Sequence, residues 1–462
     1  MRTNVSLATP RHRRSPHIAA VLSFLWPGLG QWYGGRAQAA ALFGVPVLLI
    51  LALVALQAVG GVEQLAVLLI TPSSALTVLI LVGLIGGWRL LAIANAMIGY
   101  GERDPWRSGR TGATFAILAA LVIVTHSFAG YVAWAFYDAT SRIFVAENGP
   151  DGTPAPGGSG ASSQPPGAYN PDSEYLATPL ATPQSASSRI NVLLTGIDAA
   201  SNRSHSLTDT MLVVSVDPAL NQVAMISFPR DIANFELWDG RVFKGKINSL
   251  MATARSNPEL YPDGPLPTLQ RELGYLLGVP IHYYAAVDLE GFSRMIDIVG
   301  GVTVDNPRLI DDPRYRWLDG TQGFRLSAGV HDLDGRTALA YVRSRQGAGD
   351  NDFTRARRQQ QVLRALRAKL VSPAMLPKVP AILDAAGDTI RTNFPSDRIG
   401  EMLDIGTAVN DETITQVVLG PPYAKQPPPG TTNGVYTLML DMDRLAKLSI
   451  KLFGSESAYI GG

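Results

Sequence analysis

The sequence AYVRSRQGAGDNDFTRARRQQQVLRALRAK, residues 340–369, combines a short apolar run, a cluster of arginines and the beginning of a helical pattern. Its first part, residues 340–345, is predicted to form a short strand. Because side chains alternate along a strand, Tyr341, Arg343 and Arg345 would then share one face. A strand beside a core seldom carries two arginines without partners. The pattern therefore predicts that these arginines meet an anionic group.

The second half of this stretch predicts a helix with Asp352 as its N-cap. Arg355 and Gln359 are four residues apart and share a face at the first turns. The preceding strand and the helix start would bring several cations to one place, and guanidinium groups match the oxygens of a phosphate. A solvated basic helix is the alternative interpretation. The predicted buried stripe consists of Val362, Leu363, Leu366 and Leu370.

Length and composition limit the possible classes. A chain of 462 residues is too long for one ordinary domain. The formal net charge is +1, so any electrostatic specialisation is local. The chain contains no cysteine, which excludes disulfides, thiolate catalysis and cysteine metal sites. Apolar residues make up 46% of the chain, and the first 140 residues hold most of the excess.

Residues 18–140 are predicted to be a transmembrane region that follows a basic cytoplasmic tail, residues 1–17. The segment 18–34 is apolar but short, and WPGLG interrupts it, so we expect it to lie in the interface or to re-enter. Three longer apolar segments are close to the ~20 residues that a bilayer requires. They are residues 37–59, 65–87 and 113–137.

Charges predict the topology of this region. Arg36 precedes the first span, and residues 103–110, between the second and third spans, contain three further arginines. The positive-inside rule makes both segments cytoplasmic, so three crossings place everything after Tyr137 outside the cytoplasm. Residues 141–188 are dominated by Gly, Pro, Ser, Ala and Thr and predict an extended or disordered linker.

Residues 189–420 alternate strand and helix patterns, which predicts an α/β/α sandwich with a mixed central sheet. We expect strands at residues 190–197, 210–216, 222–228, 281–288, 301–305 and 413–419. We expect helices at residues 266–277, 289–299, 375–387 and 396–409. Residues 307–324 predict an irregular loop. Residues 421–462 predict a strand and a helix that form a C-terminal extension.

Polar residues gather at the ends of the predicted strands. Asp198 ends the first strand, Asp209 begins the second, Arg230 and Asp231 follow the third, and Lys246 lies just beyond. In an open α/β sheet, ligands lie outside the strand ends. Carboxylates that hold a metal, together with arginines that neutralise phosphate oxygens, are what a magnesium diphosphate site needs. A turn or cap role is the alternative for each Asp taken singly.

Seven ordered blocks resemble the LytR-CpsA-Psr family over residues 189–372. They are NVLLTGID, TDTMLVVSVDP, ISFPRD, KIN, YYAAVDLEGFSRMIDIVGGVTVD, AYVRSR and DFTRARRQQ. The resemblance implies an enzyme anchored in the bacterial cell membrane with an extracytoplasmic α/β domain, and the three predicted spans would make it a multi-pass protein. It further implies transfer of a glycopolymer from a polyprenyl diphosphate carrier to peptidoglycan, with Mg²⁺ or another divalent cation as cofactor. Lipid-linked glycan, peptidoglycan and the bilayer are the implied partners.

The resemblance also implies roles for individual residues. The implied catalytic residues are Asp209, Arg230, Asp231, Arg343 and Arg345, with Asp231 or Asp209 assisting the acceptor hydroxyl. The implied diphosphate ligands are Arg230, Lys246, Arg343, Arg345, Arg355, Arg358 and Gln359. The implied metal ligands are Asp198, Asp209 and Asp352. Many family members have an arginine two residues before the equivalent of Asp209, whereas this chain has Leu207.

Several alternatives stay open at this point. With water as acceptor, the same site would make the chain a polyprenyl diphosphate-glycan pyrophosphatase. A non-enzymatic envelope regulator would bind polyprenyl phosphate without turnover. A nucleic-acid site is not expected, because aromatic residues are not interleaved with the basic ones. Residues 281–299 would wall a lipid channel or simply form core, and His205, His282 and His331 are expected to be structural or exposed.

Overall fold

The computed structural model describes residues 15–58, 71–98, 109–144, 188–197, 208, 210–428 and 434–460 of the chain. The chain divides into two compact units, residues 1–137 and 138–462. Most of the predicted basic tail and most of the predicted linker lie outside the described residues, as do Asp198, Leu207 and Asp209.

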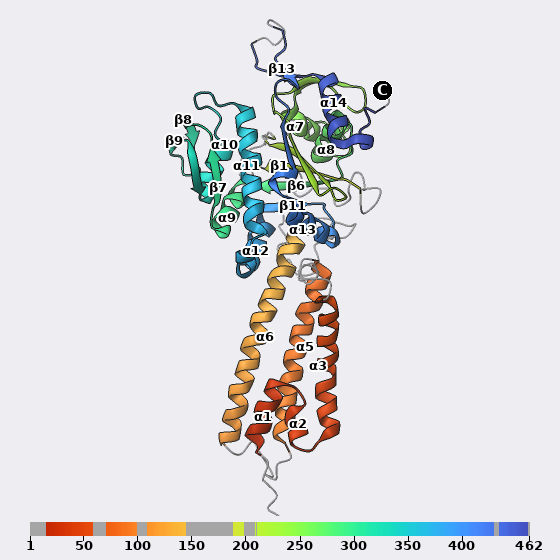
Figure 1. The fold of residues 1–462 in the computed structure, drawn as a ribbon, viewed down its shortest axis with the longest axis vertical. Coiled ribbons are helices and arrows are strands. Elements are labelled where there is room, and N and C mark those ends of the chain that lie inside the picture. The colour runs from red at the N-terminus through yellow and green to blue at the C-terminus, as the bar shows by residue number, and fades with distance from the viewer. Residues whose placement is uncertain are drawn as a thin grey trace, which may run out of the picture. The chain divides into compact units, whose positions relative to one another are not determined.

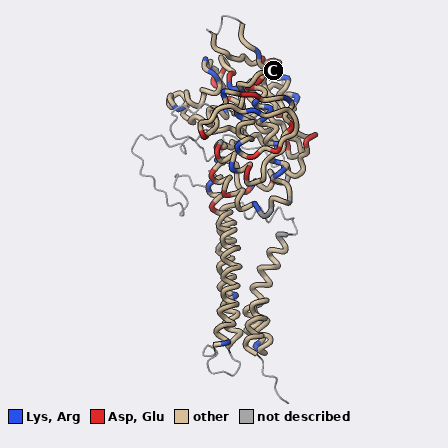
Figure 2. The backbone as a smooth tube through the Cα atoms, turned by 90° about the vertical axis from the view of Figure 1, so that its left-hand side faces the viewer, with Lys and Arg blue, Asp and Glu red and all other residues tan. Residues whose placement is uncertain are grey.

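The first unit is helical, and three of its helices are long and apolar enough to cross a membrane. They are α3 (Ala37–Ala58), α5 (Pro72–Met97) and α6 (Gly109–Ile143), the last of which continues into the second unit. Helix α5 ends later than the predicted span, and within the added part Trp88 and Arg89 donate hydrogen bonds to the carbonyl oxygens of Phe43 and Phe24. Among the described residues of this unit there is no Asp or Glu, and Figure 2 shows an almost uncharged tube.

The segment 18–34 does not form one continuous helix. It contains α1 (Pro16–Leu25) and α2 (Leu29–Tyr33). At about 1.5 Å per residue, the ten residues of α1 are about 15 Å long, half of a ~30 Å hydrocarbon core. A Cβ atom on Gly30, within α2, would lie 2.0 Å from the carbonyl oxygen of Ala19 in α1, so the close approach of the two helices requires glycine at this position.

The second unit is an α/β domain with a six-stranded mixed sheet in the order β11-β6-β1-β2-β3-β12. Strand β1 pairs parallel with β6, and β3 pairs parallel with β12, while the other neighbours are antiparallel. The predicted fold class is confirmed. The strands are β1 (Ile190–Ile197), β2 (Met211–Asp217), β3 (Gln222–Ser227), β6 (Tyr283–Asp288), β11 (Ile390–Thr392) and β12 (Ile414–Val418).

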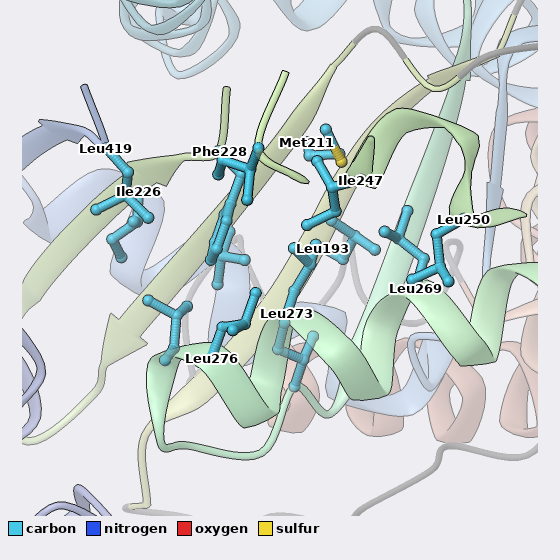
Figure 3. Packing of buried hydrophobic residues seen from close by; sticks show 14 of the residues in the cluster. Leu193, Met211, Ile226, Phe228, Ile247, Leu250, Leu269, Leu273, Leu276 and Leu419 are labelled. Carbon is cyan, nitrogen blue, oxygen red and sulfur yellow. The ribbon is translucent and has the colours of Figure 1, made fainter. Parts of the chain in front are cut away.

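One face of this sheet carries the larger core. Helix α8 (Pro265–Leu277) lays Leu269, Leu273 and Leu276 beneath the strands, and Figure 3 shows these leucines facing Leu193 and Ile226. Helix α7 (Leu250–Ser256) and the hairpin β4 (Ala233–Glu236)–β5 (Val242–Lys246) complete this layer. Helix α14 (Met442–Phe453) joins the same core, and the short strands β13 (Ala424–Lys425) and β14 (Met439–Leu440) pair with each other. The C-terminal residues are therefore part of this domain.

The opposite face packs against α11 (Asp352–Leu370) and α13 (Ile399–Ala408), and Figure 1 shows α11 between the sheet and a group of smaller strands. Helices α9 (Leu289–Val299) and α10 (Gly335–Arg343) pack against α11, and α12 (Val379–Thr389) packs against α9. Of the predicted stripe of α11, Val362 and Leu366 are buried, whereas Leu370 is exposed.

Two predictions about local structure were wrong. Residues 340–345 are not a strand but the end of α10 and the loop after it, because Asp334 caps that helix by accepting a hydrogen bond from Thr337 N. The expected loop 307–324 contains β8 (Ile310–Arg316), which pairs with β9 (Gln322–Leu326). The expected strand at residues 301–305 is confirmed as β7 (Val302–Asn306), which pairs with β10 (Gly329–Leu333) in a separate two-stranded sheet.

Candidate active site

The first half of the site follows β3. Arg230 and Asp231 lie in the connection to β4, and Lys246 ends β5 opposite Ala233. Nζ of Lys246 donates to Oδ1 of Asp231 at 2.5 Å. The β4–β5 hairpin therefore delivers the predicted lysine to the predicted carboxylate, 15 residues away in sequence.

Asp352 joins this half to the arginines that follow α10. Its Oδ2 lies 3.2 Å from Nε of Arg230 and 3.5 Å from Nη2 of Arg355. Its Oδ1 lies 3.8 Å from Nη1 of Arg345. Three guanidinium groups thus surround one carboxylate, and Arg230 lies more than 100 residues before the other two in sequence.

The charge of this cluster favours an anionic ligand. Arg230, Lys246, Arg345 and Arg355 give four positive charges against two from Asp231 and Asp352, an excess of +2. The side chains of Arg345 and Lys246 are each 30% exposed, whereas those of the two carboxylates are 10% and 13% exposed. Arg345 and Lys246 therefore reach solvent, while Arg355 (7% exposed) and the two carboxylates lie beneath them, which suits phosphate oxygens arriving from outside.

The start of α11 adds to this field. The helix is capped by Asn351, whose side chain accepts from Thr354 N in a capping box. Asp352, which the sequence predicted as the cap, is instead the first helical residue. The amide groups of a helix N-terminus carry a partial positive charge that attracts anions. Because Asn351 caps the helix, the Asp352 carboxylate is left to contact the arginines.

Arg358 and Gln359 were predicted as diphosphate ligands, and the structure gives both of them protein partners. Nη1 of Arg358 pairs with Asp350 at 3.2 Å, and its Nη2 donates to the carbonyl oxygen of Ser344. Burial lowers the pKa of Arg358, and Asp350 opposes this shift. Nε2 of Gln359 donates to Oγ1 of Thr210 at 3.0 Å. These contacts favour a bracing role for both residues.

Arg343, the other predicted catalytic arginine, ends α10 and interacts with the hydroxyl of Tyr315 on β8. Burial raises the pKa of Tyr315, and Arg343 opposes that shift. Tyr315 packs against Trp317 and Phe324, with ring centroids 5.2 and 5.7 Å away. The β8–β9 hairpin therefore supports the arginine segment.

The predicted metal ligands are only partly described. Asp198 and Asp209 lie outside the described residues, and the part of the chain that the structure describes contains no cluster of three potential metal-binding side chains. Asp352 has guanidinium groups beside both oxygens, a setting that favours ion pairing over metal coordination. Metal binding by Asp198 and Asp209 stays a prediction.

An apolar cavity of about 200 Å³ lies between the sheet and the helices on the α11 side. Its lining comes from β1, β2, β3, β12, α11 and α13, and not from residues 281–299, which the sequence offered as a channel wall. Leu363 lines it two turns beyond Arg355, about 12 Å along the helix at about 1.5 Å per residue. The remaining lining residues include Leu194, Val214, Met225, Met402 and Gly406.

The two described histidines of this domain lie apart from these contacts. Nδ1 of His282 accepts from Asn191 N at 3.0 Å, and burial, helped by Arg398, lowers the pKa of His282 to about 4. His331 contacts the carbonyl oxygen of Ser327 at 2.9 Å. Both histidines have structural partners, as expected, and His205 lies outside the described residues.

Sequence reasoning missed two residues beside the site. Tyr436 lies close enough to Asp231 and Asp352 for their charges to raise its pKa, although burial raises it more. The following Leu438 pairs with the chain at Asp231 and Ala233 through backbone hydrogen bonds of 2.8 and 2.9 Å. Asp312, on β8, binds the loop that contains Arg345. No spacing signal connects either residue with the motifs, because each is brought there by tertiary structure.

The chain is similar to proteins of known family. The family model described as "LytR_cpsA_psr family" matches residues 167–453. The chain is 27% identical over 270 residues to the polyisoprenyl-teichoic acid–peptidoglycan teichoic acid transferase TagU of Halalkalibacterium halodurans, covering 58% of this chain and 79% of that protein. It is 31% identical over 205 residues to TagV of Bacillus subtilis, a protein of the same description, covering 44% and 49%. The crystal structure of B. subtilis TagV aligns with a TM-score of 0.46 and 25% identity, covering 58% and 98%.

Proposed function

Because the chain belongs to the LytR_cpsA_psr family, we propose that it is a membrane-anchored phosphotransferase. It transfers a glycopolymer from a polyprenyl diphosphate carrier to peptidoglycan. Its relatives TagU and TagV are teichoic acid transferases, which supports this activity. The observation that carries the proposal is the arrangement along α11, where a cationic cluster at the first turn is followed by an apolar cavity.

This arrangement fits an amphiphile with an anionic head. A diphosphate placed over Arg345 and Lys246 would meet the excess of positive charge described above. The first isoprene units would then reach Leu363 and the cavity beside it. A soluble sugar nucleotide would need the cluster but not the cavity, so the combination supports a lipid-linked donor.

The reaction is phosphoryl transfer. A hydroxyl oxygen of the acceptor glycan attacks the sugar-linked phosphorus, a new P–O bond forms, and the bond to the bridging oxygen of the diphosphate breaks. Polyprenyl phosphate leaves, and Asp231 or Asp209 accepts the proton of the hydroxyl. Arg230, Arg345 and Arg355 neutralise charge that develops on the phosphate oxygens, and Arg343 is assigned the same task.

Asp231 has two features that suit it to the acceptor side. Its carboxylate is held by Lys246 and lies 3.8 Å from Nε of Arg230, so its orientation is fixed beside the phosphate-binding cations. Asp231 is 7% exposed, which limits access of bulk water to the carboxylate that accepts the proton. Positioning of this kind is the main source of rate in phosphoryl transfer.

A magnesium ion is part of the proposal, with Asp198 and Asp209 as its ligands. When bound, it would supply positive charge to phosphate oxygens that the arginines do not reach. Loss of activity with a chelator and its return with Mg²⁺ would support this assignment, while full activity in the chelator would oppose it.

We also propose that the chain crosses the membrane three times and exposes the site outside the cytoplasm. The three apolar helices support anchoring, and the arginines near α3 and between α5 and α6 support the orientation. Cysteine labelling of the cysteine-free chain tests it. A cysteine placed at Ser256 should react with an impermeant maleimide in intact cells, and one placed at Ser6 should not.

The transfer assay uses the full-length protein in detergent with Mg²⁺, a polyprenyl diphosphate-linked oligosaccharide and peptidoglycan fragments. Arg345→Ala and Asp231→Asn should lower joined product by at least about 100-fold. Arg325→Ala, whose arginine is 72% exposed on β9, is the matched control and should keep wild-type activity. Phosphate release without joined product would identify a pyrophosphatase, and tight lipid binding without turnover would identify a regulator.

A further inference from the structure

The carboxylate of Asp312 is 2% exposed and lies on β8, outside every predicted motif. Its Oδ2 accepts hydrogen bonds from Oγ of Ser344 at 2.8 Å and from the backbone N–H groups of Arg345 and Gln346, both at 3.1 Å. Its Oδ1 accepts from Arg314 N at 3.2 Å. One buried carboxylate therefore binds three consecutive residues of the loop after α10.

These contacts keep Asp312 charged. Burial alone would raise the pKa of Asp312, but the hydrogen bonds from Gln346 N, Ser344 Oγ and Arg345 N outweigh it and lower the pKa. Hydrogen bonds to a charged acceptor are roughly twice as strong as neutral ones. Asp312 thus fixes this loop more firmly than a neutral side chain would.

The loop that Asp312 holds contains a predicted phosphate ligand. The backbone of Arg345 is bound to Asp312, while its guanidinium points to Asp352 and is 30% exposed. The carbonyl oxygen of Ser344 accepts from Arg358, which fixes the other side of the loop. The direction of the Arg345 side chain therefore depends on the position of β8.

We propose that Asp312 is a positioning residue for the diphosphate group: its carboxylate holds the loop 344–346 so that Arg345 faces the phosphate oxygens. This inference rests on the proposed function, because it takes the cluster around Asp352 as the diphosphate site. Asp312 acts only through Arg345 and does not touch the ligand. A misplacement of about 1 Å in such a group is enough to cost on the order of 100-fold in activity.

The test is a double-mutant cycle with farnesyl diphosphate as the probe, using full-length protein in detergent and measuring Kd by calorimetry. Asp312→Asn keeps the shape of the side chain and removes its charge. It should weaken binding about tenfold, in line with the lost charge-assisted contacts. The matched control is Asp311→Asn, one residue earlier on β8 with a side chain 50% exposed, and it should bind as wild type does.

The second arm places Asp312→Asn in an Arg345→Ala background. If Asp312 acts through Arg345, its substitution should there change Kd by less than about twofold, because the residue that it positions is absent. A purely structural role would weaken binding equally in both backgrounds. Hydrogen exchange of residues 344–346 should accelerate in Asp312→Asn but not in Asp311→Asn.

The outcomes distinguish the positioning role of Asp312 from the diphosphate site itself. Equal loss in both backgrounds, or wild-type affinity in Asp312→Asn despite faster exchange, overturns the positioning role while the diphosphate site stands. No binding of farnesyl diphosphate by the wild-type protein overturns the proposed site and this inference together. If Asp312→Asn does not fold, Ser344→Ala removes one of the four hydrogen bonds and should produce a smaller loss, again only when Arg345 is present.

Discussion

Glu272 offers a sharp test of the core beneath the site. Its side chain lies in α8, is 0% exposed, and accepts a hydrogen bond from Trp238 N at 3.3 Å through Oε2. The other oxygen, Oε1, is buried and has no hydrogen-bond partner among the described residues. Burial, with smaller contributions from Asp239 and Glu236, raises the pKa of Glu272 to about 8.

The raised pKa of Glu272 determines how stability changes with pH. The folded protein keeps the proton up to about pH 8, whereas the unfolded chain loses it near pH 4.5. Stability is therefore full below pH 4.5 and falls as pH rises through the folded pKa. At about 1.4 kcal/mol per pKa unit, the loss approaches roughly 5 kcal/mol as an upper bound.

Replacing Glu272 with Gln removes the titration. The amide can still accept from Trp238 N, but its NH₂ group would occupy a buried position at every pH, at a cost of about 1–3 kcal/mol. That cost does not depend on pH. The free energy of unfolding of Glu272→Gln minus that of the wild type should therefore rise by about 3 kcal/mol between pH 5 and pH 8.

Hydrogen exchange of α8 peptides in mild denaturant measures this free energy in the full-length protein, at equal pH for each pair. Glu290→Gln is the matched control, because Glu290 is exposed at the start of α9. It should show no pH-dependent difference of this size. An equal difference between Glu272→Gln and wild type at pH 5 and pH 8 would refute the reasoning.

Three further predictions concern stability and the cavity. Asp350→Asn leaves the buried Arg358 without its charge partner and should lower the free energy of unfolding by about 3 kcal/mol in denaturant titrations, whereas Arg308→Ala, which removes an exposed partner of the same Asp350, should cost less than about 1 kcal/mol. Gly406→Phe should weaken binding of farnesyl diphosphate but not of inorganic diphosphate, because a Cβ atom at Gly406 meets open space and the ring would enter the cavity; equal loss for both ligands would contradict this. The pKa of His282 is about 4 in the folded protein, so the free energy of unfolding should fall by up to about 3 kcal/mol as pH falls from 6.5 to 4. In acid titrations, His282→Gln should abolish this dependence of the free energy of unfolding on pH.

The central strands could be predicted because their residues are buried on both faces. Residues 190–197 and 210–216 are apolar runs bounded by turn residues, and both became strands of the main sheet. The helices at residues 266–277 and 289–299 were equally clear, since each ends at a glycine with positive φ. The spacing of apolar residues and the turn residues and glycines at the ends were sufficient to predict these elements.

The error at residues 340–345 has a physical cause. Tyr341, Arg343 and Arg345 alternate as strand residues do, but residues 338–342 are all buried, so the burial does not alternate. The cap at Asp334 lay outside the segment that was read as a strand. A segment of sequence that began at Asp334 would have favoured the helix.

The sequence predicted which residues belong to the site better than it predicted how their side chains are arranged. Arg230 and Asp352 were both expected near the ligand, and they lie 3.2 Å apart. The orientation of Arg358 depends on the rotation of α11 and on Asp350, which a linear sequence does not show. Asp311 and Asp312 are adjacent and chemically identical, and only the register of the β8–β9 hairpin buries the second of them.

The most direct test of the proposed activity follows one phosphorus atom. The donor is a polyprenyl diphosphate-linked oligosaccharide with ³²P in the sugar-linked phosphate, incubated with full-length protein, Mg²⁺ and peptidoglycan fragments. The account predicts that the label becomes covalently attached to peptidoglycan while unlabelled polyprenyl phosphate is released. Label that stays with the lipid, or that is released on a soluble glycan phosphate in the presence of acceptor, would contradict it.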